Sequence, residues 1–431
     1  MISHSQLNPV PISSFGYDIQ GGIPSPIVNV REMGAKGDGR TDDTAAFQAA
    51  VDAVPLIGGT LVVPRGDYRI NVERSITLHS NMLLLMDPAA TLAAIPTKNP
   101  LHRLIRVWFA SNVRIVGGRL VGERRLHVTE PDAPEGKDEQ GFGISIQSSH
   151  NIVVSDVHIS DFWGDGIWLG AFGAERDEYW DELPEYGNHP KQLQSTNVLI
   201  NHVVCTHNRR QGLSMGPAEN ITIMNSTFAF AGPGFDYPQD GTPPMAGIDI
   251  EPALQGVVRN VTFSHCTFMR NRGTGLEIHG NVLGVSAHDC LCSDNFGHGF
   301  LVRELTGEKE VIGLTFSNNI VSRNGLVGMM VLDQTDSVLL AGNTFMGNGF
   351  RYPIPADENI HAEWSSWPWR NVPIPPGIID IDGEPDPERS REPDLLVERT
   401  ATNVRFRNNT YTNSGNNDPV DEEWGDPIGR P

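Results

Sequence analysis

One short pattern returns along the chain and constrains its fold more than any other feature. Each copy holds an Asn or Gly, alternating apolar residues, a polar corner, a second short strand and a turn, and then a Gly that opens another alternation. Clear copies occupy residues 151–170, 197–216, 220–252, 260–280, 284–304 and 313–333. Self-similarity at a period of roughly 20–50 residues is typical of a solenoid. Because the corners are too short for a crossover helix, the pattern predicts an all-β protein, a single-stranded parallel β-helix.

The polar corner between the first two strands of each copy tests this prediction. A tight bend between strands often needs a left-handed backbone, which Gly, Asn, Asp and His adopt at the smallest cost. Alignment of the copies places only these residue types at the corner, namely Gly117, Asp156, His202, Asn225, His265, Asp289, Asn318, Gly342 and Asn408. We call these residues the corner ladder and assign them a structural role rather than a catalytic one.

The net charge of −21 limits the partners of the chain. Nucleic acid and anionic membranes both need a basic face, so neither is expected as a partner. A polyanionic substrate would need a cation between it and the protein. The chain has no long apolar run, and its N-terminus lacks the basic and apolar regions of a secretory signal. The sequence as it stands predicts a cytoplasmic location, or a secreted one if a leader has been removed.

One elongated domain is the simplest organisation, because solenoids grow by adding copies of one unit. The expected parts are an irregular lead-in at 1–27, the β-helix at 28–415 and an acidic tail at 416–431. Insertions interrupt the repeats at 171–196, 229–246 and 350–400. The first two adjoin the same strand position in different copies, so we expect these long loops to flank one sheet.

The segment from residue 27 to residue 70, IVNVREMGAKGDGRTDDTAAFQAAVDAVPLIGGTLVVPRGDYRI, predicts an N-terminal capping helix. The helix should open near Thr41, with Asp42 and Asp43 in its first turn, where acidic residues complement the helix dipole. This segment resembles the N-terminal signature of the pectate-lyase-like superfamily of right-handed β-helix proteins. With the repeats, the resemblance covers residues 28–415. It implies a right-handed β-helix, a carbohydrate-active protein and a site on the outer face of the first parallel sheet.

Charge is concentrated on the outward positions of the strand that opens with Gly. In the pattern G-h-x-h-x, where h is apolar, the h side chains face the core and the x side chains face outward. Neighbouring copies place charged residues at these x positions, namely Asp249, Glu251, Glu277, His279 and Arg303. Asp249 and Glu251 would lie about 7 Å apart along one strand, and Asp249 and Glu277 about 4.8 Å apart across two strands.

These spacings fit the carboxylate pairs of glycosidases, which lie about 5–5.5 Å apart in retaining enzymes and about 6.5–9.5 Å apart in inverting ones. Two carboxylates this close raise the pKa of at least one of them, as a general acid requires. We therefore expect a glycoside hydrolase that needs no cofactor or metal, in which Asp249, Glu251 and Glu277 supply the acid and the base or nucleophile. The residues expected to bind or orient the sugar are His279, Arg303, Arg210, Asp165, Trp168 and His298.

Two other functions remain open. The three carboxylates could hold Ca²⁺ through oxygen ligands, and this arrangement resembles that of the calcium-dependent lyases, and by extension the epimerases, that act on uronate polymers. Lysine, a common base in those enzymes, is absent from these strands, so His279 or Arg303 would have to serve as base. The other alternative is a non-catalytic, glycan-binding spike. All three functions imply an oligosaccharide or polysaccharide partner, and a homo-oligomer is left open.

Motifs of individual families match only in part. Polygalacturonases of the superfamily carry several motifs on successive copies, of which only Gly297-His298-Gly299 is present here. Ala246 and Thr274 stand where aspartates are expected. The Asp-Pro-His motif of alginate epimerases is absent. Neither mechanism can therefore be carried over residue by residue.

Overall fold

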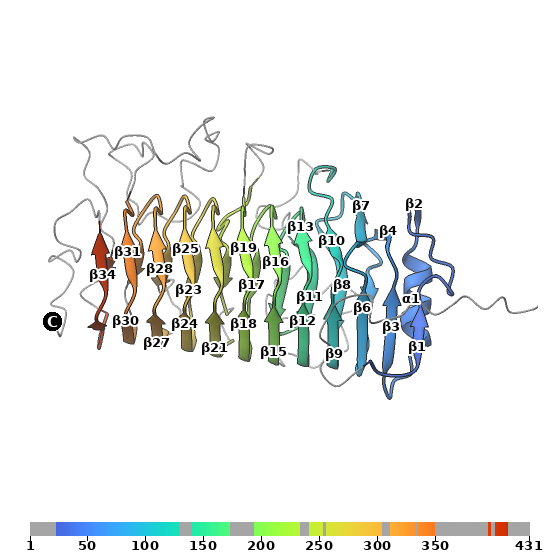
Figure 1. Cartoon of the computed structure of the whole chain (residues 1–431), viewed down its shortest axis with the longest axis horizontal. Helices are drawn as coiled ribbons and strands as arrows, with labels where there is room; N and C mark the ends of the chain where they lie inside the picture. The colour runs from blue at the N-terminus through green and yellow to red at the C-terminus, as the bar shows by residue number, and fades with distance from the viewer. Residues whose placement is uncertain are drawn as a thin grey trace, which may run out of the picture.

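The computed structural model shows a long stack of β-strand coils (Figure 1). It describes residues 23–128, 140–172, 194–232, 241–252, 256–303, 311–332, 334–349, 395–397 and 401–412. From β3 onward, successive strands belong to three parallel sheets in turn, and each strand pairs with strands of the neighbouring coils. This arrangement is a parallel β-helix, so the fold class expected from the repeats is confirmed.

The three sheets, called here A, B and C, are listed in their order along the stack. Sheet A consists of β1 (Ile27–Asn29), β3 (Gly59–Val63), β6 (Met82–Met86), β9 (Ser111–Val116), β12 (His150–Ser155), β15 (Ser195–Asn201), β18 (Ala218–Met224), β21 (Val258–Ser264), β24 (Val282–His288), β27 (Val311–Ser317), β30 (Thr335–Ala341) and β33 (Arg405–Arg407). Sheet B consists of β2 (Asp38–Asp42), β4 (Gly66–Asn71), β7 (Ala90–Ile95), β10 (Arg119–Val121), β13 (His158–Ser160), β16 (Val204–Thr206), β19 (Thr227–Ala229), β22 (Thr267–Met269), β25 (Leu291–Ser293), β28 (Ile320–Ser322), β31 (Thr344–Met346) and β34 (Thr410–Thr412). Sheet C consists of β5 (Ile76–Thr77), β8 (Leu101–Trp108), β11 (Gln140–Gln147), β14 (Ile167–Gly170), β17 (Leu213–Met215), β20 (Ile248–Ile250), β23 (Leu276–His279), β26 (Phe300–Arg303), β29 (Met329–Val331) and β32 (Leu395–Val397).

The helix α1 (Thr44–Ala53) lies at the N-terminal end of the stack (Figure 1) and buries Phe47 and Val51 in the common core. It begins later than expected, because β2 extends to Asp42. The placement of Asp42 and Asp43 in its first turn was therefore wrong. The carboxylate of Asp43 instead accepts hydrogen bonds from the backbone amides of residues 36 and 37, at 2.6 and 3.0 Å. This acid stabilises the Gly-rich turn before the helix rather than the helix dipole.

The corner ladder adopts the backbone conformation that its composition predicted. Every one of its residues has a positive φ, between 50° and 82°. Asp156, His202, His265 and Asp289 therefore occupy left-handed corners between sheets A and B. Backbone geometry therefore explains why Asp and His occur at these corners.

A second ladder of side chains lies buried in the turns between sheets B and C. It consists of Asn271, Asn295, Asn324 and Asn348. From Asn295 onward, each amide oxygen accepts hydrogen bonds from the backbone N–H and the side-chain amide of the asparagine one coil earlier, at 2.9–3.1 Å. The Asn271 oxygen accepts from the backbone N–H of Ala231, at 3.1 Å. These bonds satisfy polar groups that would otherwise be buried without partners, and they fix the turns that lead into sheet C.

A column of glycines opens the strands of sheet C, which explains why the sequence pattern demands Gly there. The column consists of Gly166, Gly212, Gly247, Gly275 and Gly299. A Cβ added at any of them would lie 2.3–2.7 Å from the carbonyl oxygen of the equivalent glycine in the next coil. Only glycine therefore lets neighbouring coils approach at this point.

The change Gly275→Ala is expected to lower the free energy of unfolding by about 1–3 kcal/mol, the usual cost of overpacking. Its Cβ would lie 2.4 Å from Cys292 Sγ and 2.7 Å from the carbonyl oxygen of Gly299. Gly216→Ala is the matched control, because the nearest atom to its added Cβ is Trp168 Cζ2 at 3.5 Å, an ordinary contact. Urea unfolding of both variants checks the prediction, and equal midpoints would show that the glycine column is not sterically required.

The first 22 residues of the lead-in, most of the expected insertions at 171–196 and 350–400, and the acidic tail lie outside the described residues, as do residues 233–240 of the expected insertion at 229–246. Their expected boundaries stay predictions. Within the part of the chain that the structure describes, no helix has the length and apolar character needed to span a membrane.

Candidate functional site

Sheet C brings the predicted charged residues side by side on its outer face. Its parallel register places Asp249 on β20 next to Glu277 on β23. In the same way, His279 on β23 lies next to Arg303 on β26. The alignment of the sequence copies is therefore confirmed at these positions. Because the side chains come from different coils, the stacking of the coils gathers them rather than any local motif.

Asp249 is buried within this group, with 1% of its surface exposed. Its Oδ1 lies 3.1 Å from His279 Nε2, and its Oδ2 accepts a hydrogen bond from Gln211 Nε2 at 3.0 Å. Burial raises the pKa of the carboxyl group, whereas the charge and hydrogen bond of His279 lower it. The charges of Arg210 and Arg303 lower it further, and the resulting pKa lies below its usual value. Asp249 is therefore an anion at neutral pH.

Glu277 lies beside Asp249, and its pKa shifts in the opposite direction. Its side chain is fully buried, and its Oε1 accepts a hydrogen bond from Arg303 Nε at 2.9 Å. Burial is the main cause that raises the pKa of Glu277 to about 7; the charge of Arg303 opposes this rise and the charge of Asp249 adds to it. Near neutral pH, Glu277 can hold a proton while Asp249 does not. Such a separation of two pKa values is typical of acid–base sites.

A chain of hydrogen bonds joins Asp249 to Asp165. Gln211, which bonds Asp249, also contacts Ser214 Oγ, and this hydroxyl donates to Asp165 Oδ2 at 2.6 Å. Arg210 Nη1 donates to the same Asp165 oxygen at 3.2 Å. The structure thus brings Asp165 and Arg210 to the site. It also adds Ser214 and Gln211, for which the sequence analysis assigned no role.

Glu251 differs from the other two carboxylates because 45% of its side chain is exposed. Its Oε2 lies 3.9 Å from Arg210 Nη2, a loose ion pair at the edge of the group. Asp249 and Glu277 are therefore the two carboxylates that are buried together.

Trp168 and His298 are both buried next to the outer face of sheet C. The indole of Trp168 lies against the backbone of Gly170 and Gly216, where an added Cβ would come within 2.7 and 3.5 Å of the ring. Only 2% of Trp168 is exposed. His298 lies in the turn before β26, in the same place in its coil as Asp165 and Gln211 in theirs. Their roles in sugar binding stay predictions.

The same group contains atoms that could hold a cation. Ligand atoms of Asp249, Glu277 and His279 all lie within 4.8 Å of one another. Ca²⁺ prefers about 6–8 oxygen ligands, whereas this set includes an imidazole, and its carboxylate oxygens already face Gln211 and Arg303. Glu277 Oε2 has no hydrogen-bond partner among the described residues and is the carboxylate oxygen most open to a cation.

Arginines add positive charge to the outer face of sheet C although the chain as a whole is acidic. On β8, the guanidinium carbons of Arg103 and Arg106 lie 5.9 and 4.6 Å from the ring centroid of Trp108. Arg210 and Arg303 lie farther along the stack, beside the acidic group. Guanidinium groups match the geometry of carboxylates, and Arg210 and Arg303 pair in this way with Asp165 and Glu277.

Profiles of known families recognise two parts of the chain. Residues 192–354 match the family described as right handed beta helix region. Residues 27–98 match the family described as rhamnogalacturonase A/epimerase, pectate lyase-like. The right-handed form of the β-helix and the resemblance to pectate-lyase-like proteins are thereby confirmed.

Curated relatives share segments of the sequence. The uncharacterized protein YclG of Bacillus subtilis (strain 168) is 26% identical over 351 residues, which are 74% of this chain and 55% of that protein. Alginate lyase 7 of Azotobacter vinelandii is 36% identical over 139 residues, which are 32% of this chain and 12% of that protein. The chain spans about half the length, or less, of these relatives.

A solved structure matches most of the chain. The A-module of the mannuronan C-5 epimerase AlgE6 from Azotobacter vinelandii aligns with a TM-score of 0.62 at 18% identity, covering 91% of this chain and 89% of that one. At this identity the match shows a shared fold. The fold is one found in carbohydrate-active enzymes, and these matches do not single out hydrolysis, the reaction expected from the sequence.

Proposed function

We propose that this chain, a right-handed parallel β-helix of the pectate-lyase-like kind, is an enzyme that removes the C5 proton of a uronate unit in an acidic polysaccharide. Elimination and C5 epimerisation share this first step. The observation that carries the proposal is the pairing of Asp249 with His279 directly beside the pairing of Glu277 with Arg303. In the first pair, the carboxylate can orient an imidazole that acts as a base. In the second pair, the guanidinium and the protonated carboxyl group can bind the carboxylate of the substrate.

The base in this proposal is His279. Asp249 lies 3.1 Å from its Nε2, orients the ring, and stabilises the imidazolium that forms when the other ring nitrogen takes up the C5 proton. The electron pair of the broken C–H bond moves toward the uronate carboxylate. The positive charge of Arg303 then stabilises the negative charge that develops there, and protonated Glu277 can donate a hydrogen bond to it. In elimination, the electrons form a C4–C5 double bond while the C4–O bond breaks, and the leaving oxygen takes up the proton that His279 removed or one from water. In epimerisation, C5 regains a proton from water on its other face, and His279 returns its own proton to water.

The arginines support an acidic substrate. Arg106 on β8, with Arg210 and Arg303 near the acidic group, gives a chain of net charge −21 a face that can bind carboxylates. The names of the relatives, an alginate lyase and a mannuronan epimerase, agree with this substrate class. The negative charge of the chain therefore does not require a bridging cation, although Ca²⁺ stays a proposed cofactor for elimination.

A glycoside hydrolase is the second candidate, and one observation favours it. Asp249 and Glu277 differ in pKa in the way a nucleophile and a general acid do, and their ligand atoms lie within 4.8 Å. Against it, both Asp249 oxygens already take part in contacts with His279 and Gln211. An ionised carboxylate held in this way is better suited to orient a base than to attack a sugar.

Incubation of the protein with a panel of neutral and acidic polysaccharides in D₂O, read by mass spectrometry, tests the proposal. Elimination is expected to give fragments with an unsaturated, ultraviolet-absorbing end, and epimerisation to give uncleaved polymer with deuterium at C5. Hydrolysis would add the elements of water at each cleaved bond and overturn the first proposal in favour of the second. Oligosaccharide binding without any product would favour a non-catalytic spike. A parallel series with EDTA, with and without added Ca²⁺, tests the cofactor.

A further inference from the structure

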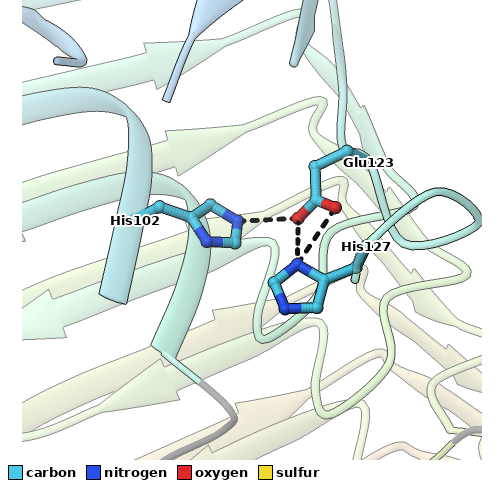
Figure 2. Close-up of side chains that lie close together, drawn as sticks. All are labelled: His102, Glu123 and His127. Atoms are coloured by element: carbon cyan, nitrogen blue, oxygen red, sulfur yellow. Dashed lines mark hydrogen bonds and ion pairs between the residues drawn. The ribbon is translucent and has the colours of Figure 1, made fainter. Parts of the chain in front are cut away.

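We propose that His102, Glu123 and His127 form a zinc-binding site, separate from the carboxylates of sheet C (Figure 2). His102 belongs to β8, whereas Glu123 and His127 follow β10 in the next coil. All three side chains are fully buried. Three ligands from protein side chains are enough for a zinc site that keeps one position open.

The ligand atoms are already close to the spacing that zinc requires. Glu123 Oε1 lies 2.9 Å from His102 Nε2 and 3.0 Å from His127 Nδ1, and Glu123 Oε2 lies 3.1 Å from the same His127 nitrogen. Zinc bonds to nitrogen and oxygen are about 2.0–2.2 Å long, so ligand atoms around one zinc lie about 3.0–3.5 Å apart. Small side-chain movements suffice to accept the ion. Figure 2 shows the three side chains pointing toward one another.

The hydrogen bonding of His102 prepares one ring nitrogen for a metal. Its Nδ1 lies 2.7 Å from the carbonyl oxygen of Asn99, which can only accept, so Nδ1 carries the proton. In the neutral ring, Nε2 then presents a lone pair. This buried Nε2 has no hydrogen-bond partner among the described residues, because its approach to Glu123 is not aligned for one. A backbone carbonyl that holds the far nitrogen is a usual companion of metal-ligating histidines.

A bound cation would also stabilise the buried negative charge of Glu123. A carboxylate removed from water is costly unless it is paired or bound to a metal. Within the described ranges, the polar partners of the Glu123 carboxylate are the imidazoles of His102 and His127, while the adjacent Arg124 donates to two backbone carbonyl groups elsewhere. A divalent cation would supply positive charge and leave both imidazoles neutral.

The ligand types favour zinc over the other abundant divalent cations. Ca²⁺ and Mg²⁺ prefer sets made wholly of oxygen ligands. Two imidazole nitrogens and one carboxylate are a common set for Zn²⁺. The site therefore differs in preference from the carboxylate-rich group of sheet C.

The surrounding residues hold the ligands in place. The ring of Trp163 stacks on that of His127, with centroids 4.0 Å apart and an interplanar angle of 16°. The guanidinium carbon of Arg209 lies 3.9 Å from the Trp163 centroid. At Gly141, an added Cβ would come within 2.5 Å of His102 Cε1, so glycine is needed to make room for this imidazole. Zinc here would join two neighbouring coils through a packed site.

Calorimetric titration of chelator-treated protein with Zn²⁺ tests the proposal without any sugar substrate. We expect one zinc per chain, with a Kd tighter than about 1 μM. Glu123→Gln should weaken binding by more than about 100-fold, because loss of an outer contact alone costs about 10–100-fold. Glu219→Gln, the same change on sheet A, is the matched control, and His279→Gln excludes binding at the sheet C group. Both should keep the wild-type affinity.

X-ray absorption at the zinc edge gives a measurement that does not depend on how the variants fold. The wild-type protein loaded with one zinc should show a first shell of nitrogen and oxygen, with the outer scattering of two imidazole rings. Failure to bind zinc, unchanged affinity in Glu123→Gln, or a first shell without two imidazoles would overturn the proposal. The three residues would then be an ion-paired cluster that only fixes the turn after β10.

Discussion

Replacement of His279 by Gln is expected to lower kcat on the productive polysaccharide by about 10²–10⁴-fold, the share that one general acid–base group contributes. Gln can keep a polar contact with Asp249, whose Oδ1 lies 3.1 Å from His279 Nε2, but it cannot take up a proton. Because the substrate would still meet Arg303 and Glu277, KM should change less than kcat. Steady-state kinetics with the substrate found in the panel measure both constants.

His288→Gln is the control for this variant. His288 ends β24 in sheet A, about a third of its side chain is exposed, and its ring hydrogen-bonds the neighbouring Asp289 and lies edge-on to the ring of His265. The same substitution there should leave kcat unchanged. If His279→Gln keeps the wild-type kcat, His279 is not the base and the proposed first step is wrong.

The pH dependence of kcat/KM provides a signature for the neighbouring carboxyl group. The pKa of Glu277 is raised from 4.5 to about 7, so this group is protonated in the folded protein at pH values where a free carboxyl is ionised. The activity that uses protonated Glu277 should fall as the pH rises through about 7. Glu277→Gln is neutral at every pH and should lose this alkaline limb. By linkage, the stability contributed by the protonated group is fully present below about 4.5 and is lost as the pH rises through about 7.

The substitution Asn295→Ala is expected to lower the free energy of unfolding by about 3–5 kcal/mol, since each buried polar group left without a partner costs about 1–3 kcal/mol. The Asn295 amide donates to the carbonyl oxygen of Phe268 and to Asn324 Oδ1, at 3.1 and 3.0 Å. Its oxygen accepts from the backbone and side-chain amides of Asn271, at 3.1 and 2.9 Å. Alanine would break the ladder at its centre. Urea unfolding followed by circular dichroism measures the loss.

Asn201→Ala is the matched control for the ladder. Asn201 accepts one hydrogen bond, from Asn225 Nδ2 at 2.9 Å, in an exposed setting. Water can replace that bond, so the change should cost no more than about 0.5 kcal/mol. A similar loss in both variants would mean that burial of the ladder does not determine its contribution.

The backbone of the β-helix was predictable where residue type reports a backbone need. The corner ladder is such a case, because its Gly, Asn, Asp and His residues all have positive φ. Phe230, Arg270 and Arg323 also have positive φ, at 53–57°, yet nothing in their residue types indicates it. At these corners the hydrogen bonds between coils hold the backbone, and the side chain only has to tolerate it.

The sequence was enough to predict which residues of the site are neighbours, but not that they are buried. Strand alternation and the repeat were enough to place Asp249 beside Glu277. Their burial depends on the side chains that pack around them on the outer face of sheet C. Local sequence periodicity does not describe that packing. Ser214 and Gln211 could have been found, since Ser214 is the outward neighbour of Asp249 and Gln211 immediately precedes the Gly of its strand.

The proposed zinc ligands could not be predicted from the sequence for a different reason. His102 lies on one coil, and Glu123 and His127 lie in a turn of the next coil, outside every repeated position. No spacing motif joins them, because the contact depends on how the turn after β10 folds back over β8. Such a site becomes visible only when the coordinates of the two coils are compared.

The glycine column has a consequence for how proteins of this shape can change. Because each coil meets the next through the same strand pairings and the same glycine approach, the loss or duplication of a whole coil would repeat contacts that the stack already makes. Asp249 and Glu277 belong to successive coils, so a coil inserted between them would separate the reacting groups by a full strand spacing. The number of coils could therefore change along most of the stack without loss of the fold. A coil inserted between β20 and β23, however, would take the proposed active site apart.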